Sequence, residues 1–243
     1  MRGATTMNDM ELTKLISSFV IGDGALSNLK HYGKGKGNYE INKKKNSKYY
    51  IKQLTIHKDY IEWQQEILEN LTKVYINIIP EYTDKRGYFC KEKFELFTKC
   101  HPFYTTMRNN FYVNNEKIIS PHYLKLWDAQ SLAILYMDDG WLEKKINQNG
   151  TIYHRIGIAT HSYSYGDNML LKKMLKEKFA IEFDIKRHKQ KSGEYKFYLR
   201  NSKNNSLKFI DLVSPYIFPS FQYKIDKFAQ LAPENKNQDD DIV

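Results

Sequence analysis

Apolar residues recur at helical spacing in two similar stretches, one near the start of the chain and one at its middle. The apolar positions of residues 11–24 lie one, three or four places apart: Leu12, Leu15, Ile16, Phe19 and Val20. This spacing predicts an amphipathic helix, and Gly22 and Gly24 end it around Asp23. Residues 128–141 form a second, more apolar stretch that also ends in acidic residues and a glycine. The chain therefore has two predicted helices with the same kind of C-terminal end.

Alternating apolar and polar positions predict strands in both halves, at 49–57, 88–98, 152–160, 181–188 and 194–200. Helical spacing predicts further helices at 59–74, 102–111, 166–179 and 206–213. The polar stretches 27–48 and 143–150 are interpreted as arms outside these elements. Because the strands fall in closely spaced pairs without crossover helices between them, we expect antiparallel sheets rather than a parallel α/β sheet.

Four short sequence landmarks occur twice and in the same order. The pairs are GDG at 22–24 with DDG at 138–140, LTIH at 54–57 with IATH at 158–161, KFEL at 93–96 with KFYL at 196–199, and EKI at 116–118 with YKI at 223–225. Four matches in register favour a duplicated α+β unit over chance. We place the two repeats at 10–119 and 120–232, and we expect the polar, acidic tail at 233–243 to be disordered.

The charge of the chain narrows the choice of partner. The formal net charge is +10 and the pI is about 9.3, which favours a polyanionic partner, although a lysine-rich soluble surface explains the same numbers. An acidic membrane is disfavoured because no basic helix has a clean apolar face. Cys90 and Cys100 form no CxxC pair, which indicates a reducing, intracellular compartment and argues against structural zinc. Codon-related bias toward Lys, Asn, Ile and Tyr suits a mitochondrion or a phage or bacterial cytoplasm equally.

The two acidic helix ends are the candidate chemistry. Small residues that allow close helix packing occur in both helices: Ser17, Ser18, Gly22, Ser131 and Ala133. If the helices pack side by side, Asp23 and Asp139 become neighbours, and their repulsion favours a hard divalent cation such as Mg²⁺. Backbone carbonyls near Gly22 and Asp138 are further candidate metal ligands. One Asp-Gly pair alone is an ordinary helix stop; two, in duplicated helices of a basic chain, favour a metal site.

At these residues the sequence resembles a family. ISSFVIGDG (16–24) and LAILYMDDG (132–140) are similar to the nine-residue LAGLIDADG motif. Ile21 and Met137 replace the acid at its sixth position, whereas Asp23 and Asp139 occupy the eighth, metal-binding position. MDDGW and PYIFPSFQYK (215–224) resemble the single-chain, two-repeat homing endonucleases encoded within introns, and the similarity extends over nearly the whole chain.

The resemblance implies both a fold and an activity. The implied fold is α+β, with two pseudo-symmetric αββαββα repeats, paired motif helices at the centre and two antiparallel sheets that form a DNA-binding saddle. The implied activity is site-specific cutting of double-stranded DNA, by hydrolysis of one phosphodiester on each strand. Asp23 and Asp139 are the implied catalytic metal ligands for Mg²⁺, with Mn²⁺ as a substitute. Lys224 and Lys117 lie where the family has a basic residue near the cleaved phosphate, and no side chain is identified as the general base.

The resemblance also implies polar residues beside the metals, late in the strand after each motif helix. Thr55 and Ala159 fall at these positions, with Gln53, His57 and His161 nearby. Because Ala159 cannot position water or metal, we expect the second site to differ from the first, and a slow second cut is one consequence. Since the halves differ in sequence, the resemblance further implies a monomer with a long asymmetric target.

Basic and polar side chains in the predicted strands and arms are the candidate DNA contacts. In the first half they are Lys30, Lys34, Lys36, Lys43, Lys44, Lys45, Lys48, Lys52, Gln53, Arg86, Lys91 and Lys93. In the second half they are Lys144, Lys145, Arg155, Lys186, Arg187, His188, Lys189, Lys191, Lys196 and Arg200. Lysines are typical of phosphate contacts, and the four arginines are the better candidates for guanine recognition.

Three other functions compete with a nuclease. A maturase with the same fold would bind its host intron RNA, and the presence of both Asp23 and Asp139 favours the nuclease over it. A DNA-binding regulator would require an additional helix-turn-helix segment, for which the chain has no spare length. A purely structural role would not explain why both helices end in acidic residues.

Overall fold

The computed structural model describes residues 7–28 and 48–226, which form two halves with the same order of elements. The first half contains α1 (Asp9–Ile21), β1 (Ala25–Asn28), β2 (Tyr49–Thr55), α2 (Lys58–Glu69), β3 (Val74–Ile79), β6 (Lys93–Thr98) and α3 (Pro102–Phe111). The second half contains α5 (Ala129–Asp139), β9 (Gly140–Ile146), β10 (Ile152–Ile158), α6 (Tyr165–Phe179), β11 (Phe183–Lys189), β12 (Tyr195–Asn201) and α7 (Lys203–Val213). Each half thus follows the order αββαββα.

Short elements lie between and after these two sets. The small hairpin β4 (Tyr82–Thr83) and β5 (Phe89–Cys90) extends the loop between β3 and β6. The connection between the halves contains β7 (Tyr112–Val113), β8 (Glu116–Lys117) and α4 (Pro121–Leu124). Two 3-10 helices, η2 (Ser214–Tyr216) and η3 (Pro219–Lys224), follow α7. The chain therefore returns to the centre of the molecule after the second sheet is complete.

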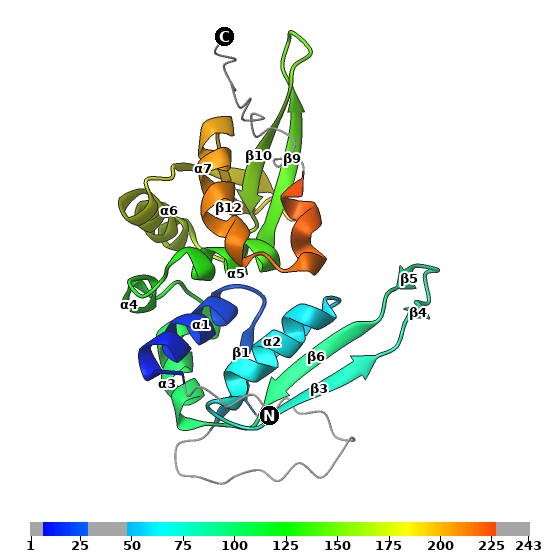
Figure 1. Cartoon of the computed structure of the whole chain (residues 1–243), viewed down its shortest axis with the longest axis vertical. Helices are drawn as coiled ribbons and strands as arrows, with labels where there is room; N and C mark the ends of the chain where they lie inside the picture. Colours follow the sequence, from blue (N-terminus) through cyan, green and yellow to red (C-terminus); the bar gives the residue numbers. More distant parts are fainter. Residues whose placement is uncertain (1–6, 29–47, 227–243) are drawn as a thin grey trace, which may run out of the picture.

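The two sheets have matching topology. Their strand orders are β1-β2-β6-β3 and β9-β10-β12-β11, and every neighbouring pair is antiparallel. Figure 1 shows the β9–β10 hairpin extending upward and the β3–β6 hairpin extending to the right, with α1 and α5 between the sheets. The expected α+β class with two antiparallel sheets is confirmed. The exact repeat boundaries, 10–119 and 120–232, stay a prediction.

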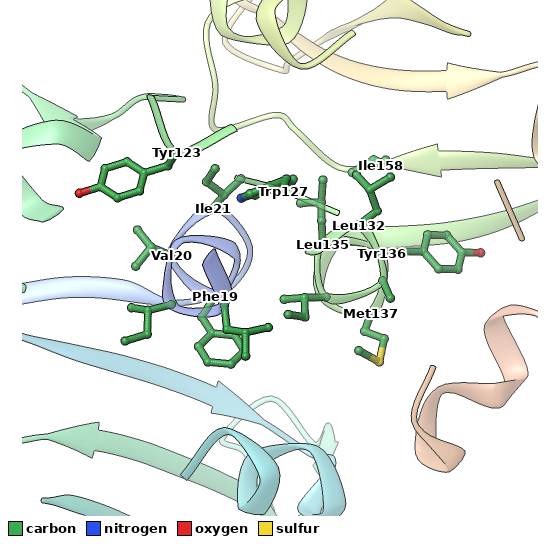
Figure 2. Packing of buried hydrophobic residues seen from close by; sticks show 14 of the residues in the cluster. Phe19, Val20, Ile21, Tyr123, Trp127, Leu132, Leu135, Tyr136, Met137 and Ile158 are labelled. Atoms are coloured by element: carbon green, nitrogen blue, oxygen red, sulfur yellow. The ribbon is translucent and has the colours of Figure 1, made fainter. Parts of the chain in front are cut away.

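Helices α1 and α5 pack against each other at the centre of one continuous hydrophobic core (Figure 2). The small residues predicted to allow this packing are all fully buried: Ser17, Ser18, Ser131 and Ala133. Large side chains such as Phe19 and Tyr136 fill the space on the outer sides of the pair, toward the two sheets. Both helices are almost entirely buried, which explains why they are so apolar on all sides.

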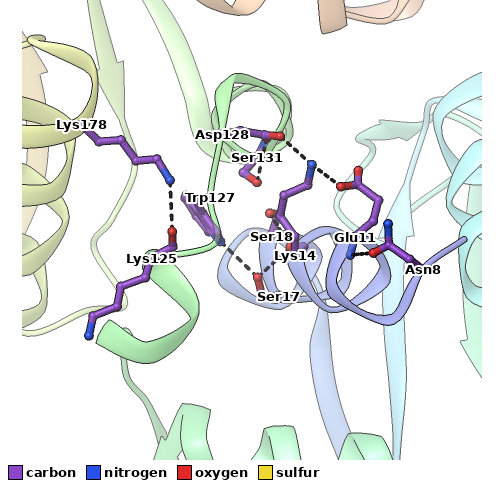
Figure 3. Close-up of polar contacts among 10 residues, drawn as sticks. All are labelled: Asn8, Glu11, Lys14, Ser17, Ser18, Lys125, Trp127, Asp128, Ser131 and Lys178. Atoms are coloured by element: carbon purple, nitrogen blue, oxygen red, sulfur yellow. Dashed lines mark hydrogen bonds and ion pairs between the residues drawn. The ribbon is translucent and has the colours of Figure 1, made fainter.

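Polar contacts join the two helices at the end where α5 begins (Figure 3). Lys14 of α1, only 7% exposed, donates to Asp128 Oδ2 at 2.5 Å and pairs with Glu11 at 2.7 Å. Asp128 is the N-cap of α5 and accepts from the Ser131 N–H at 3.0 Å. The Trp127 indole N–H donates to Ser17 Oγ at 3.1 Å. These bonds satisfy the buried polar atoms and fix how the helices are aligned.

We expect Asp128→Ala to destabilise the protein by about 2 kcal/mol, because it removes a helix cap and one partner of the buried Lys14 ammonium. Burial alone would raise the pKa of Asp128, but hydrogen bonds from Lys14 and Ser131 hold it below its ordinary value. The stabilisation is therefore present above about pH 4 and is lost as pH falls through the folded-state pKa. Urea unfolding at pH 7 and pH 3 measures both effects; an equal loss at both pH values would contradict this assignment.

Several predicted elements have different limits in the structure. The first helix begins at Asp9, because Asn8 caps it through the Glu11 N–H, and it ends at Ile21. The predicted helix at 59–74 ends at Glu69, and the apolar run from Val74 to Ile79 is instead strand β3. The predicted strand at 88–98 is divided into β5 and β6.

The predicted arm at 143–150 is wrong for its first half, 143–146. Residues 140–146 form strand β9, which pairs with β10 along seven positions. Two of its three charged residues, Glu143 and Lys145, lie on the face of the sheet away from the core, and this run of polar residues resembled a loop. The arm at 27–48 and the tail at 233–243 fall largely or wholly outside the described residues.

Two further predictions concern the compartment. Cys90 and Cys100 are both free thiols in the structure, whereas the predicted localisation itself stays a prediction. Among the described residues, no helix combines the length and apolar character needed to cross a bilayer.

Candidate active site

The two motif helices end side by side, and each end presents an aspartate. Asp23 lies in the turn after α1 and is exposed, while Asp139 is the last residue of α5 and is partly buried. The turn after α1 is fixed by N–H groups of Gly22 and Gly24, which donate to the carbonyls of Ser18 and Phe19 at 3.0 and 2.8 Å. A side chain at Gly24 would collide with the Phe19 carbonyl, because its Cβ would lie 2.5 Å from that oxygen. The glycine is therefore required for this turn.

The acidic groups influence one another. Burial first, and then the nearby charge of Asp23, raise the pKa of Asp139 to about 7, against the lowering effect of Lys117 and Lys224. Although Asp23 is exposed at the surface, the protein around its carboxylate removes part of its hydration and raises its pKa, again opposed by both lysines. The pKa of Asp138 is raised well above its ordinary value, chiefly by burial and by Asp23. A concentration of negative charge that is costly to ionise is a place where a cation binds favourably.

Lys117 and Lys224 each bind two backbone carbonyls at one of the two helix ends. The Lys117 ammonium on β8 donates to the carbonyls of Gly22 and Gly24 at 2.8 and 3.0 Å. The Lys224 ammonium on η3 donates to the carbonyls of Tyr136 and Met137 at 3.2 and 2.6 Å. Burial lowers the pKa of both lysines, that of Lys117 to about 8, and the three aspartates partly offset this effect. The structure thus brings all four predicted catalytic residues together.

The oxygen atoms at the two helix ends fit a hard divalent cation whose remaining ligands come from water and substrate. Mg²⁺ commonly binds through one or two carboxylates, several waters and substrate phosphates. Within residues 7–28 and 48–226, no three His, Cys, Asp or Glu side chains converge into a complete cage, so the protein offers part of a shell. Asp23 and Asp139 supply carboxylates, and the predicted carbonyl ligands belong to Gly22, which also accepts from Lys117, and Asp138.

We expect metal affinity to depend steeply on pH below neutrality. With a pKa of about 7, Asp139 is largely protonated in mild acid, and a cation must displace that proton. Affinity for Mn²⁺ should therefore fall about tenfold for each pH unit below pH 7 and level off above it. Calorimetric titration of the DNA-free protein between pH 5.5 and 8, with Asp139→Asn as control, measures this. An affinity that is constant over this range would contradict the expected proton competition.

A pocket of about 270 Å³ opens beside Asp23. Its lining includes Asp23, Thr55, His57, Lys93, Asp138 and Lys224. Thr55 and His57 therefore lie near the first acid, as predicted from their place at the end of β2. The His57 ring packs on Phe221, with 3.9 Å between ring centroids, and burial lowers its pKa.

The corresponding region of the second half is different. Ala159 has no polar side-chain atom, and its N–H donates to the Asp139 carbonyl at 2.8 Å. His161 lies against the rings of Tyr198 and His188, with centroid distances of 5.4 and 6.4 Å. The expected difference between the two sites is therefore present in the side chains around them.

Many of the predicted DNA contacts share the sheet faces that point away from the helices. Strand register places these residues on that face: Lys52, Lys93, Lys145, Arg155, Lys186, His188, Lys196 and Arg200. Trp141 and Tyr198 lie on the same face, with ring centroids 5.6 Å apart. Glu143 neutralises part of this charge through Lys145, Arg155 and Arg200, at 2.8, 3.5 and 3.7 Å. The outer sheet faces therefore carry both basic side chains and aromatic rings.

The other predicted contacts lie elsewhere. Residues near strand ends and hairpin tips, or on the opposite strand parity, are Lys48, Arg86, Lys91, Lys144, Arg187, Lys189 and Lys191. Residues outside the described ranges are Lys30, Lys34, Lys36, Lys43, Lys44 and Lys45. Gln53 is only 3% exposed and donates to Asp138 Oδ1 at 3.4 Å, so it belongs to the acidic site and not to the exposed face. Of the two places predicted for Gln53, the structure supports the one near the acids and not the DNA contact.

Sequence reasoning missed two tyrosines at the helix ends and the role of one predicted residue's side chain. The Asp138 side chain accepts from the Asp23 N–H at 3.1 Å, although only its carbonyl was predicted to matter. The Tyr163 hydroxyl donates to the Ile21 carbonyl at 2.5 Å, and the fully buried Tyr60 also approaches Asp138. The sequence contains one hint of the Asp138 contact: the seventh motif position is Gly22 in the first copy and Asp138 in the second.

The fold and the site define a class of protein: an α+β chain with two similar halves, whose central helices present paired acids between two basic antiparallel sheets. The model of the LAGLIDADG DNA endonuclease family matches residues 22–209. The chain belongs to this family.

Individual relatives are more distant. The chain is 32% identical over 171 residues to Protein RecA of Mycolicibacterium flavescens, a match that covers 69% of this chain and 37% of that protein. It thus spans little more than a third of that relative. It is 26% identical over 157 residues to the intron-encoded endonuclease ai4 of Dictyostelium discoideum, covering 64% and 89% of the two chains. It is 25% identical over 178 residues to the cytochrome b mRNA maturase bI2 of Debaryomyces hansenii, covering 71% and 62%.

Among solved structures, the homing endonuclease I-WcaI bound to its DNA recognition sequence is similar, with a TM-score of 0.69 and 22% identity. The match covers 91% of this chain and 88% of that one. It confirms the fold that the motif resemblance implied.

Proposed function

We propose that this chain is a site-specific endonuclease that cuts both strands of double-stranded DNA with the help of a divalent metal. The observation that carries the proposal is the juxtaposition of Asp23 and Asp139 at two helix ends, each with a buried lysine bonded to the carbonyls of that end. Family membership and the fold support the same activity. We further infer a single-chain, two-repeat enzyme that acts as a monomer, because each half contributes one acid and one lysine.

The residues have distinct roles in this proposal. Asp23 and Asp139 would hold Mg²⁺, or Mn²⁺ in its place, and the ion supplies charge stabilisation and activates water for in-line hydrolysis. Lys117 and Lys224 place positive charge beside the phosphate, where negative charge develops during the reaction. Since each ammonium is fixed by two carbonyls, little reorganisation is needed when DNA binds. The outer sheet faces would hold the duplex through phosphate and base contacts.

The proposal is tested by selection on DNA. The purified protein is incubated with a randomised duplex library in Mg²⁺, Mn²⁺, Ca²⁺ or EDTA, and the cut ends are sequenced. We expect one long, asymmetric consensus that is cut on both strands in Mg²⁺ or Mn²⁺ and is uncut in EDTA. Gel filtration of the protein–DNA complex should give one protein chain per duplex. Specific binding without cutting in either metal would contradict the nuclease assignment.

An RNA-binding maturase is the second candidate, favoured by the similarity to the Debaryomyces hansenii maturase. The exposed basic and aromatic sheet faces suit either nucleic acid. Binding of intron RNA that persists in Asp23→Asn and Asp139→Asn, together with no cutting of DNA by the wild type, would support this candidate. The compartment in which either activity operates stays a prediction.

A further inference from the structure

The seventh motif position differs between the two halves, and the difference has a structural consequence. The first copy has Gly22 there and the second has Asp138. A Cβ atom at Gly22 would lie 2.1 Å from Asp138 Oδ2. The acidic side chain of one helix therefore occupies the space that the glycine of the other helix leaves open. The contact crosses the boundary between the halves.

Both carboxylate oxygens of Asp138 hold parts of the first half. Oδ2 accepts from the Asp23 N–H at 3.1 Å, and Oδ1 accepts from Gln53 Nε2 at 3.4 Å. The N–H groups of Gly22 and Gly24, on either side of Asp23, donate to carbonyls of α1. The N–H of Asp23 itself donates to Asp138. Gln53 extends from β2, the strand that leads to the pocket beside Asp23.

The second acid does not need such a contact. Asp139 is still part of α5, whereas Asp23 lies two residues beyond the end of α1. On β10, the position that corresponds to Gln53 in strand register is Ile158, whose apolar side chain is fully buried. Asp139 is thus held by its own helix, and no polar side chain from β10 takes the place that Gln53 has in the first half.

We propose that Asp138 is a positioning residue for Asp23, contributed by the opposite half of the chain. By fixing the backbone N–H of Asp23, it orients a carboxylate that no helix holds. Within the proposed function, on which this inference rests, Asp138 then supports the cut made at the Asp23 end more than the cut made at the Asp139 end. Hydrogen bonding, and not the negative charge of Asp138, carries this role.

The first measurement does not depend on activity. Amide hydrogen exchange of the Asp23 N–H is followed by NMR in the metal-free protein. We expect Asp138→Ala to accelerate it at least tenfold, while Asp138→Asn, which keeps a side-chain oxygen, leaves it near wild type. Asp128→Ala is the matched control, because it removes an aspartate of the same helix that also contacts α1, at the far end. Unchanged exchange in Asp138→Ala would overturn the proposal, whether or not the protein cuts DNA.

The second measurement connects the contact to cutting. Duplex DNA labelled on each strand gives two nicking rates, and the quantity of interest is their ratio. Asp138→Ala should change this ratio about tenfold, Gln53→Ala should change it in the same direction, and Asp138→Asn should restore it. Equal slowing of both strands, as expected for Asp128→Ala, indicates only lost stability and would overturn the role. An Asp138→Asn variant as impaired as Asp138→Ala would assign the effect to charge and also overturn it.

The two proposals fail in different ways. If the wild type cuts no DNA in any metal, the proposed function is wrong, and a role for Asp138 in cutting is wrong with it. The exchange measurement still decides whether Asp138 fixes Asp23. Gln53→Ala provides the second variant if Asp138→Ala does not fold, because Gln53 contacts the same carboxylate from β2.

Discussion

Asp23→Asn and Asp139→Asn should each reduce double-strand cleavage at least about 10³-fold. Asparagine preserves the size of the side chain but removes the charge that holds a divalent cation. Because the two acids belong to different halves, either substitution alone should abolish the double-strand product. Asp211→Asn, on the exposed face of α7, is the matched control and should cut as the wild type does. Strand-labelled DNA distinguishes a nicked product from an uncut one, and a wild-type rate in either variant would refute the site.

Asp139→Asn should stabilise the metal-free protein. Since the folded-state pKa of Asp139, about 7, lies above the unfolded value, the folded protein loses stability as pH rises from about 4 to 7. Asp139→Asn escapes this loss, so at pH 8 it should be more stable by about 1–3 kcal/mol after allowance for solvent screening. Thermal melting should show a gain of a few degrees at pH 8 and almost none at pH 4. A lower melting temperature at pH 8 would contradict the cost of ionising Asp139, which comes first from burial and then from Asp23.

Gly140→Ala should be the most damaging conservative change at the second helix end. A Cβ at this position would lie 2.0 Å from the Tyr136 ring and 2.4 Å from its carbonyl oxygen. Tyr136 is fully buried, its hydroxyl donates to the Lys224 carbonyl at 2.9 Å, and its carbonyl accepts from the Lys224 ammonium. Displacing Tyr136 therefore also displaces Lys224. We expect a loss of about 2–4 kcal/mol in stability and a cleavage rate reduced more than tenfold.

The control for this change is Gly166→Ala in α6, where the nearest atom to a new Cβ is Ser164 Oγ at 3.7 Å. That methyl group meets no obstacle, and alanine favours the helix, so stability should rise by about 0.5 kcal/mol. Urea unfolding and cleavage rates of the two variants, measured side by side, separate a local clash from a general effect of replacing glycine. Wild-type stability in Gly140→Ala would show that Tyr136 and Lys224 are not held as described.

The sequence predicted helices and strands correctly where the spacing of apolar residues matches the side of the element that is buried. The motif helices are apolar on every side because they cross the core, and their acid-glycine ends located Asp23 and Asp139. Alternation predicted β2, β10 and β12 because one face of each strand is buried. Strand β3 was missed because its apolar run follows directly on a helix. Strand β9 was missed because the charged residues on its outer face resemble a polar arm.

Contacts between segments that lie far apart in the chain could not be predicted from the sequence. Nothing in the neighbourhood of Asp138 indicates that its side chain crosses to the other half, since the acceptor relation with Asp23 depends on the packing of α1 and α5. Gln53 was predicted both beside the metals and among the DNA contacts, and the sequence alone could not choose between the two places. Its buried face follows from the strand register, which is defined only by the pairing of β2 with β6. The two lysines were located through the resemblance to the family, and EKI and YKI, which contain them, also occupy corresponding places in the repeat.

The packing of α1 against α5 also determines the shape of the ends that the proposed enzyme leaves. Bonds at one end of the pair, from Lys14 and Trp127, and at the other, from Asp138 and Tyr163, prevent the helices from sliding past each other. The distance between Asp23 and Asp139 is then fixed by the packing of the two helices. The stagger between the two broken bonds should be equally constant, so that every target, whatever its sequence, yields single-stranded overhangs of one length and one polarity.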